Sequence, residues 1–179
     1  MTFPEASKGS YLLLLQLEAP SRLTIGRLGT FDFPQGWLVY TGSALGSGGL
    51  RGRLKHHLAP VKKSHWHVDY LRQAAVCREV WYAVGDVSFE HDWAATLLKL
   101  PDASIPVARF GASDCRCPTH LVAFADRPQI DAFNALAEIK VQGWLVSWIA
   151  PQRSQRPRRK NQRKVAKDAK HSFKGSPEP

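Results

Sequence analysis

Residues 37–58 read WLVYTGSALGSGGLRGRLKHHL. The apolar run Trp37–Tyr40 predicts a buried strand, and the glycine-rich segment 42–49 predicts a tight turn whose backbone amides are exposed. Residues 50–58 have the spacing of a helix, because their leucines recur at every fourth position and therefore lie on one face. This order of strand, turn and helix is the most informative part of the chain.

Three side chains of this segment carry chemistry. Arg53 and His57 are four residues apart, so they emerge on one side of the predicted helix, just after a strand that presents the hydroxyl of Tyr40. A phenol, a guanidinium and an imidazole beside exposed backbone amides suit a phosphate group under nucleophilic attack. Three further residues are expected to contact phosphate or nucleic acid: Gly42, Ser43 and Lys55.

A second tyrosine motif precedes this segment. The tripeptide 9–11, Gly-Ser-Tyr, opens an apolar strand, and the tripeptide 40–42, Tyr-Thr-Gly, closes a later one. Together with Arg53 they resemble the GIY-YIG nuclease superfamily, which is named for two such tripeptides on neighbouring strands, and more specifically its DUF123 branch. The resemblance covers residues 8–124, and the segments that point to the branch are YTGSA (40–44), GGL (48–50), WHVDYL (66–71) and FGASDCRCPTHL (110–121).

The resemblance implies a metal-dependent nuclease that hydrolyses phosphodiester bonds in DNA, with a role in DNA repair or processing. The implied site residues are Tyr11 and Tyr40 as candidate bases, Arg53 as phosphate contact, His57 as helper and Glu90 as ligand of Mg²⁺ or Mn²⁺. A free phenol has a pKa of ~10, so we expect Arg53 and a bound cation either to favour its ionised form or to lower the pKa of the water itself. The substitutes are Glu79 and Asp92 for the metal ligand and His56 for the helper.

Each of these residues also has a structural interpretation. Tyrosines on strands commonly pack in the core, an arginine on an exposed helix face is ordinarily solvated, and Glu90 in the first turn of a helix interacts favourably with the helix dipole. The main functional alternative is a nucleic-acid-binding module that keeps the fold and catalyses nothing. RNA stays open as a partner beside DNA.

A second group of residues lies outside the nuclease pattern. Cys115, Cys117 and His120 offer three ligands to Zn²⁺, with His67 as a fourth, although the Cys-x-Cys spacing is tighter than that of common zinc sites. The same loop also suits a thiol nucleophile beside His120, or a buried turn held by hydrogen bonds. His67 and Asp69 are alternatively an extension of the nuclease cleft. The sequence leaves these alternatives open.

Strand and helix signals are interspersed along residues 8–150; among them are a strand-like piece at 23–29 and a helix from Ser88, a candidate N-cap, to Leu100. They predict one domain of the α/β or α+β class, a small mixed or antiparallel sheet flanked by helices, as in GIY-YIG nucleases. The chain lacks an uninterrupted apolar run of about 18–20 residues, so no membrane partner is expected. Its three cysteines, an odd number, do not suggest a disulfide framework, and a cytoplasmic setting is expected.

The positive charge is concentrated at the C-terminal end. Residues 151–179 hold ten Lys and Arg against two Asp and Glu, so they carry a net +8 of the formal +10. They are also rich in proline and poor in apolar residues, which predicts a disordered basic tail. The tail is either a solubilising extension or an arm that binds nucleic acid, through residues such as Arg158, Arg159 and Lys160.

Overall fold

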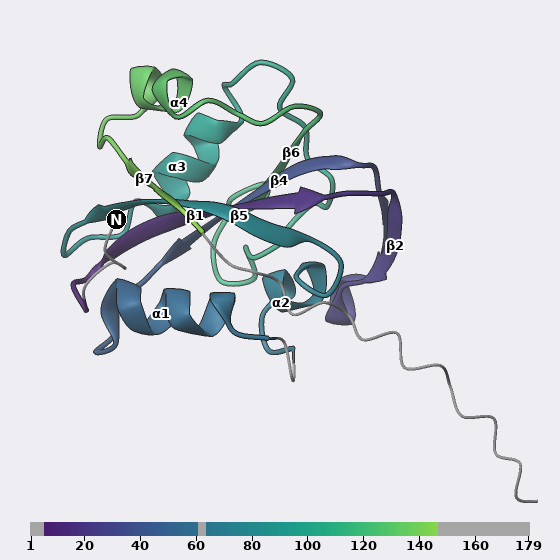
Figure 1. Cartoon of the computed structure of the whole chain (residues 1–179), viewed down its shortest axis with the longest axis horizontal. Helices are drawn as coiled ribbons and strands as arrows, with labels where there is room; N and C mark the ends of the chain where they lie inside the picture. The colour runs from purple at the N-terminus through teal and green to yellow at the C-terminus, as the bar shows by residue number, and fades with distance from the viewer. Residues whose placement is uncertain (1–5, 61–63, 147–179) are drawn as a thin grey trace, which may run out of the picture. The chain divides into compact units, whose positions relative to one another are not determined.

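The computed structural model describes residues 6–60 and 64–146, all of which belong to one unit, Met1–Ser147 (Figure 1). The elements are β1 (Gly9–Leu17), β2 (Ser21–Thr24), a 3-10 helix (Gly26–Leu28), β3 (Thr30–Phe33), β4 (Gly36–Ser43), α1 (Gly49–Leu58), α2 (His67–Leu71), β5 (Val76–Val84), α3 (Glu90–Leu97), β6 (Leu121–Phe124), α4 (Ile130–Leu136) and β7 (Gln142–Leu145). The predicted tail at 151–179, with Arg158, Arg159 and Lys160, lies outside the described residues, as do the last residues of the predicted domain 8–150.

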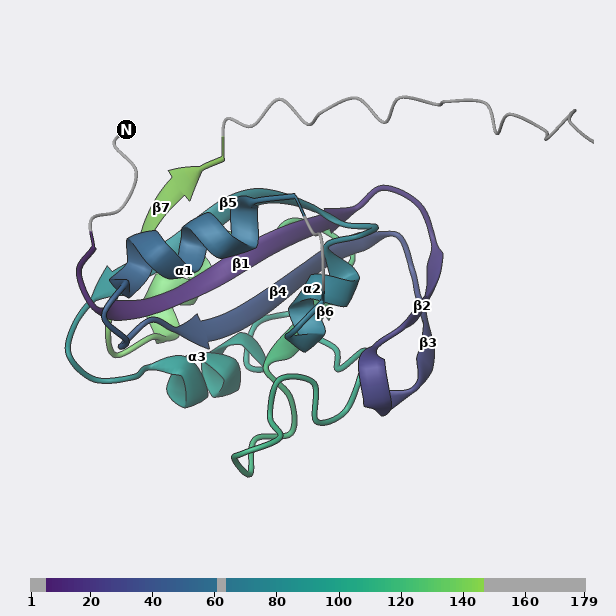
Figure 2. The same ribbon diagram turned by 90° about the horizontal axis from the view of Figure 1, so that it is seen from below.

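The main sheet has five strands in the order β6-β4-β1-β5-β7, and every neighbouring pair is antiparallel. Helices α1 and α2 cover one face of the sheet, and α3 and α4 cover the other (Figures 1 and 2). The predicted class, a small antiparallel sheet flanked by helices, is confirmed. None of the helices among the described residues has both the length and the apolar character needed to cross a membrane.

The uninterrupted apolar run of β1 follows from this layering. Leu13 and Leu15 pack in the core that contains α1 and α2, whereas Leu12 and Leu14 pack in the core that contains α3 and α4. All four leucines are fully buried. A strand that is covered on both faces has no solvent side, so its sequence does not alternate between apolar and polar residues.

Two parts of the fold differ from the sequence-based prediction. The piece 23–29, predicted as strand-like, is a strand only to Thr24 and then a 3-10 helix. Gly26 and Gly29 have φ angles of 48° and 116°, a region that ends an extended strand. The helix predicted from Ser88 to Leu100 is shorter, Glu90–Leu97, and the Ser88 side chain does not cap it; Ser88 Oγ accepts a long hydrogen bond, 3.3 Å, from the Glu90 N–H.

The register of β1 and β4 sets the position of both motif tyrosines. Tyr11 lies opposite Gly42, and Leu13 lies opposite Tyr40. Side chains alternate along a strand, so Tyr11 and Leu13 project from the same face. Tyr40 belongs to the same core, the one that contains α1. Both phenols therefore lie on the face of the sheet that α1 covers.

Candidate active site

One cavity of about 310 Å³ collects the candidate catalytic side chains. They come from two strands and two helices: Tyr11 from β1, Tyr40 from β4, Arg53 and His57 from α1, and Glu90 from α3. The other lining residues are Gly42, Ser43, Trp66, Gly111, Ser113 and Asp114. In the sequence these side chains are spread over eighty residues, from Tyr11 to Glu90. The structure brings their phenols, guanidinium, imidazole and carboxylate together on one surface.

The shortest contact of the site joins Tyr11 to His57. The phenol oxygen lies 2.7 Å from Nε2 of the imidazole, and both side chains are buried. Burial raises the pKa of Tyr11 well above its ordinary value of 10.0, and burial lowers the pKa of His57 to about 3. At neutral pH the pair is therefore a neutral phenol hydrogen-bonded to a neutral imidazole.

Arg53 alone does not make either phenol ionise at neutral pH. Arg53 does act to lower the pKa of both tyrosines, but burial outweighs it. Burial is the main cause of the raised pKa of Tyr40, and the carboxylate of Glu90 acts in the same direction. The sequence alone does not reveal how deeply the two phenols are buried.

Asp69 is a buried carboxylate near His57 that does not line the cavity. One ring nitrogen of His57 and one of His56 lie within 4.8 Å of an Asp69 carboxylate oxygen. The other oxygen, Oδ2, accepts the backbone N–H groups of His65 at 2.9 Å and Trp66 at 3.0 Å. Burial acts to raise the pKa of Asp69, but these N–H groups hold it below its ordinary value, so an anion lies near the imidazole of His57.

Arg53 is held by an aromatic ring that the sequence analysis did not single out. Its guanidinium carbon lies 4.6 Å from the ring centre of Trp66, a cation–π geometry. Trp66 remains 40% exposed and also lines the cavity. The indole thus fixes the arginine at the opening of the site and presents an apolar face beside it.

Gly42 has a steric role in the site. A Cβ at this position would lie 2.3 Å from the hydroxyl oxygen of Tyr11 and 2.5 Å from its Cζ. The ring of Tyr11 therefore occupies the space that a side chain at position 42 would fill. Of the three predicted phosphate contacts, Gly42 and Ser43 line the cavity, whereas Lys55 is exposed on α1 and does not.

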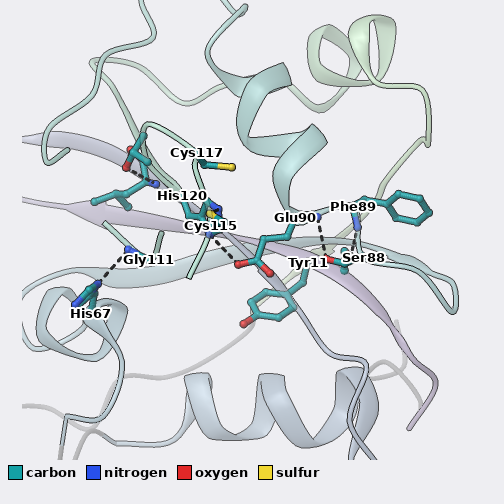
Figure 3. A network of polar contacts seen from close by, with 12 residues as sticks. Tyr11, His67, Ser88, Phe89, Glu90, Gly111, Cys115, Cys117 and His120 are labelled. Atoms are coloured by element: carbon teal, nitrogen blue, oxygen red, sulfur yellow. Dashed lines mark hydrogen bonds and ion pairs between the residues drawn. The ribbon is translucent and has the colours of Figure 1, made fainter. Parts of the chain in front are cut away.

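The structure describes all three candidate metal-ligand acids, and of these three Glu90 alone lines the cavity. Its Oε1 lies 2.8 Å from Nδ1 of His120, which is an ion-pair distance without the alignment of a hydrogen bond (Figure 3). Glu79, which lies on β5, instead forms an ion pair with Arg127 at an N–O distance of 2.5 Å. Asp92 lines a different cavity, beside α4. Both substitutes are therefore remote from the phenols.

Asp114 is a second carboxylate on the same cavity, and in the sequence it was quoted only as a member of the segment 110–121. Its negative charge, like that of Glu90, contributes to the raised pKa of Tyr40, after burial. Asp114 belongs to the irregular segment between α3 and β6, which has no periodic pattern from which its position could be read. Its place beside Tyr40 follows from the tertiary fold alone.

The second group of residues assembles differently from the prediction. Ligand atoms of Cys115, Cys117 and His120 do lie together, within 4.8 Å of one another, but the fourth member is His91 from α3. His67, predicted as that fourth member, accepts the N–H of Gly111 at Nδ1 over 3.0 Å. Neither His67 nor Asp69 lines the cavity, so they do not extend the cleft.

Gly111 allows this segment to approach the tyrosine strand. Its φ of 70° favours glycine, and a Cβ there would lie 3.0 Å from the ring of Tyr40 and 3.1 Å from Cβ of His120. The close approach places His120 beside Glu90, whose carboxylate lines the cavity.

The family model of the domain of unknown function DUF123 matches residues 10–141. The chain belongs to the DUF123 family. The match contains every residue that lines the cavity and all four members of the His91, Cys115, Cys117 and His120 group. No curated protein and no solved structure was found to match the chain. The description of the DUF123 family names no activity, so the relation to GIY-YIG nucleases stays a prediction.

Proposed function

We propose that this DUF123 domain hydrolyses phosphodiester bonds in DNA with a bound Mg²⁺ or Mn²⁺, as a GIY-YIG-type endonuclease of DNA repair or processing in the cytoplasm. One observation carries the proposal: two phenols, a guanidinium, an imidazole and a carboxylate line a single cavity. Phosphodiester hydrolysis needs a proton acceptor for the attacking water and positive charge for the phosphate oxygens. These side chains offer both.

Arg53 supplies the fixed positive charge. A guanidinium binds two phosphate oxygens at once, and the contact with Trp66 at 4.6 Å holds it at the cavity. Ser43 lines the same cavity and offers a hydroxyl to the phosphate. The phenol of Tyr40, which burial keeps protonated, donates a hydrogen bond to a phosphate oxygen.

The chemistry of the carboxylates fits a hard divalent cation. Glu90 and Asp114 line one cavity, and both act on the pKa of the same phenol, that of Tyr40. Mg²⁺ is usually held by one or two carboxylates together with substrate phosphates and water. When bound there, the cation stabilises the charge that develops on the phosphate oxygens.

Tyr11 and His57 form the route for the proton. As water attacks phosphorus, it gives a proton to the Tyr11 oxygen, and Tyr11 passes its own proton to Nε2 of His57 over 2.7 Å. The P–O bond to the leaving strand breaks, and the departing oxygen takes up a proton from solvent water. Burial disfavours the imidazolium form of His57, so the proton reaches Nε2 only as negative charge develops on the attacked phosphate, and the nearby Asp69 carboxylate acts to raise the pKa of His57.

Cleavage of a DNA panel tests the proposal. The full chain is incubated with branched, flapped, single-stranded and linear DNA in Mg²⁺ or Mn²⁺, and with matching RNA. Arg53→Ala is expected to lower the cleavage rate on the order of 10³-fold, and Glu90→Gln is expected to abolish cleavage with DNA binding retained. The matched controls are Arg51→Ala on α1 and Asp92→Asn on α3, neither of which lines the cavity.

A nucleic-acid-binding module without chemistry is the second candidate. The observation that favours it is the exposed indole of Trp66 beside Arg53, since aromatic faces and arginines together bind nucleic-acid bases and phosphates. Such a module would shift DNA in a gel and leave every substrate of the panel intact in both metals. That result would replace the nuclease proposal by the binding one.

A further inference from the structure

Two cysteines and two histidines stand together outside the proposed reaction. One ligand atom from each of His91, Cys115, Cys117 and His120 lies within 4.8 Å of every other. Two sulfur and two nitrogen donors are the ligand set of structural zinc sites. We infer that these four side chains bind one Zn²⁺ ion, and that this ion fixes the loop of Cys115 to helix α3.

The spacing of the donors fits tetrahedral zinc. With Zn–S and Zn–N bonds of about 2.3 and 2.0–2.1 Å, neighbouring ligands of a tetrahedron are about 3.3–3.8 Å apart. Sγ of Cys115 and Nε2 of His120 are already 3.4 Å apart. The rings of His91 and His120 also lie close, with their centres 5.4 Å apart. The remaining donor pairs lie within 4.8 Å, so they are at most about 1–1.5 Å farther apart than in a tetrahedral zinc site.

The loop that carries the thiols is pinned at its base. Backbone hydrogen bonds join Arg109 N to the Pro118 oxygen at 2.6 Å and His120 N to the Phe110 oxygen at 2.7 Å. Cys115 and Cys117 are both free thiols, so they are not tied to each other by a disulfide. A fixed loop base presents the two sulfur atoms to α3, where His91 completes the set.

The second nitrogen of His120 has the partner that metal-bound histidines usually have. Nδ1 lies 2.8 Å from Oε1 of Glu90, and the negative charge of the carboxylate favours a proton on Nδ1, which leaves Nε2 free to bind metal (Figure 3). Glu90 thereby connects the zinc site to the cavity. Four protein ligands leave no open coordination position, so the ion is structural and takes no part in hydrolysis.

A thiol enzyme built on the same loop is disfavoured by position. Neither Cys115 nor Cys117 lines the cavity that holds the arginine and the phenols. Two thiols and two imidazoles that converge on one point, with a carboxylate behind one imidazole, match metal binding more closely than nucleophilic catalysis.

Metal analysis of the full chain tests the inference. Protein produced with zinc in the medium and purified without chelator is expected to hold about one Zn²⁺ per chain. The double variant Cys115→Ser/Cys117→Ser and the variant His91→Ala are expected to hold almost none. Cys77→Ser is the matched control, because Cys77 lies in β5 outside the group, and it should keep its zinc. Zinc-free wild-type protein, or zinc retained in the double variant, would overturn the inference.

A measurement on the wild-type chain covers the case in which the variants do not fold. After replacement of zinc by Co²⁺, we expect the intense visible bands of tetrahedral cobalt and a thiolate-to-cobalt charge-transfer band. Weak octahedral bands, or the absence of charge transfer, would contradict the site. Both measurements are independent of DNA cleavage, so they test the zinc site separately from the proposed nuclease activity.

Discussion

The hydroxyl of Tyr11 lies 2.7 Å from Nε2 of His57, and this contact joins the central strand β1 to helix α1. Both groups are buried, and burial disfavours the charged form of each. It raises the pKa of the phenol and lowers the pKa of the imidazole. The pair is thus poised as a neutral donor and a neutral acceptor. A proton can move along it when charge develops at the cavity.

Removal of the Tyr11 hydroxyl tests this route. If Tyr11 relays the proton of the attacking water, Tyr11→Phe should lower the single-turnover cleavage rate about 10²–10⁴-fold with little change in DNA affinity. The control is Tyr82→Phe, because Tyr82 lies opposite Tyr11 on β5 but does not line the cavity. Wild-type rates in Tyr11→Phe would exclude Tyr11 from the reaction and leave Tyr40 as the remaining phenol.

The buried imidazole of His57 should make the fold sensitive to acid. Its pKa is about 3 in the folded chain and near the ordinary 6.5 in the unfolded chain. Between these values the unfolded chain binds more protons, so stability falls as the pH falls, by about 1.4 kcal/mol for each pH unit. Above pH 6.5 this contribution is fully present.

Urea unfolding at a series of pH values measures the effect. Wild-type protein should lose stability from about pH 6 downward, and His57→Gln, which cannot titrate, should lose it less steeply. His65→Gln serves as the control, since His65 is an exposed histidine. Parallel pH profiles for wild type and His57→Gln would show that the imidazole is not kept neutral by the fold.

Trp66 is expected to act through Arg53. Loss of the cation–π contact, worth about 0.5–1 kcal/mol, should weaken DNA binding about two- to fivefold in Trp66→Ala. Trp66→Phe keeps an aromatic face and should recover most of the affinity. Fluorescence anisotropy with labelled DNA measures both. Equal affinities for wild type and Trp66→Ala would show that the indole does not set the position of the arginine.

The sequence predicted the parts of the fold that have a local period. Leu50 and Leu54 are buried on one face of α1 as their spacing indicates, and β1 and β4 are apolar because helices cover both faces of the sheet. The approach of Arg53 and His57 to one cavity follows from their separation of one helical turn. Each of these relations depends on a short stretch of consecutive residues, so the sequence alone predicts it.

The rest of the site depends on contacts between distant segments. Trp66 precedes helix α2 as its N-cap, Asp114 belongs to a loop and His91 to helix α3, and no spacing rule connects them to the tyrosines. The direction of the phenol pKa was also missed, because a charge count includes Arg53 but not the depth of burial. Only tertiary packing determines both.

Gly42 gives the sharpest test of the packing around Tyr11. A methyl group at position 42 would lie 2.3 Å from the Tyr11 oxygen, so Gly42→Ala must displace the ring or shift β4 against β1. Such overpacking costs about 1–3 kcal/mol, and the displaced phenol should also lose its contact with His57 and slow cleavage.

Gly52→Ala is the matched control for this change. Gly52 is exposed on α1, where an added Cβ meets nothing within 4 Å. Alanine should therefore raise the stability there by about 0.5–1 kcal/mol, because it restricts the unfolded chain and favours the helix. Thermal or urea unfolding of both variants measures the difference. If Gly42→Ala were as stable and as active as Gly52→Ala, Tyr11 could not lie against β4 as described, and the hydrogen bond that begins the proposed proton route would lose its structural basis.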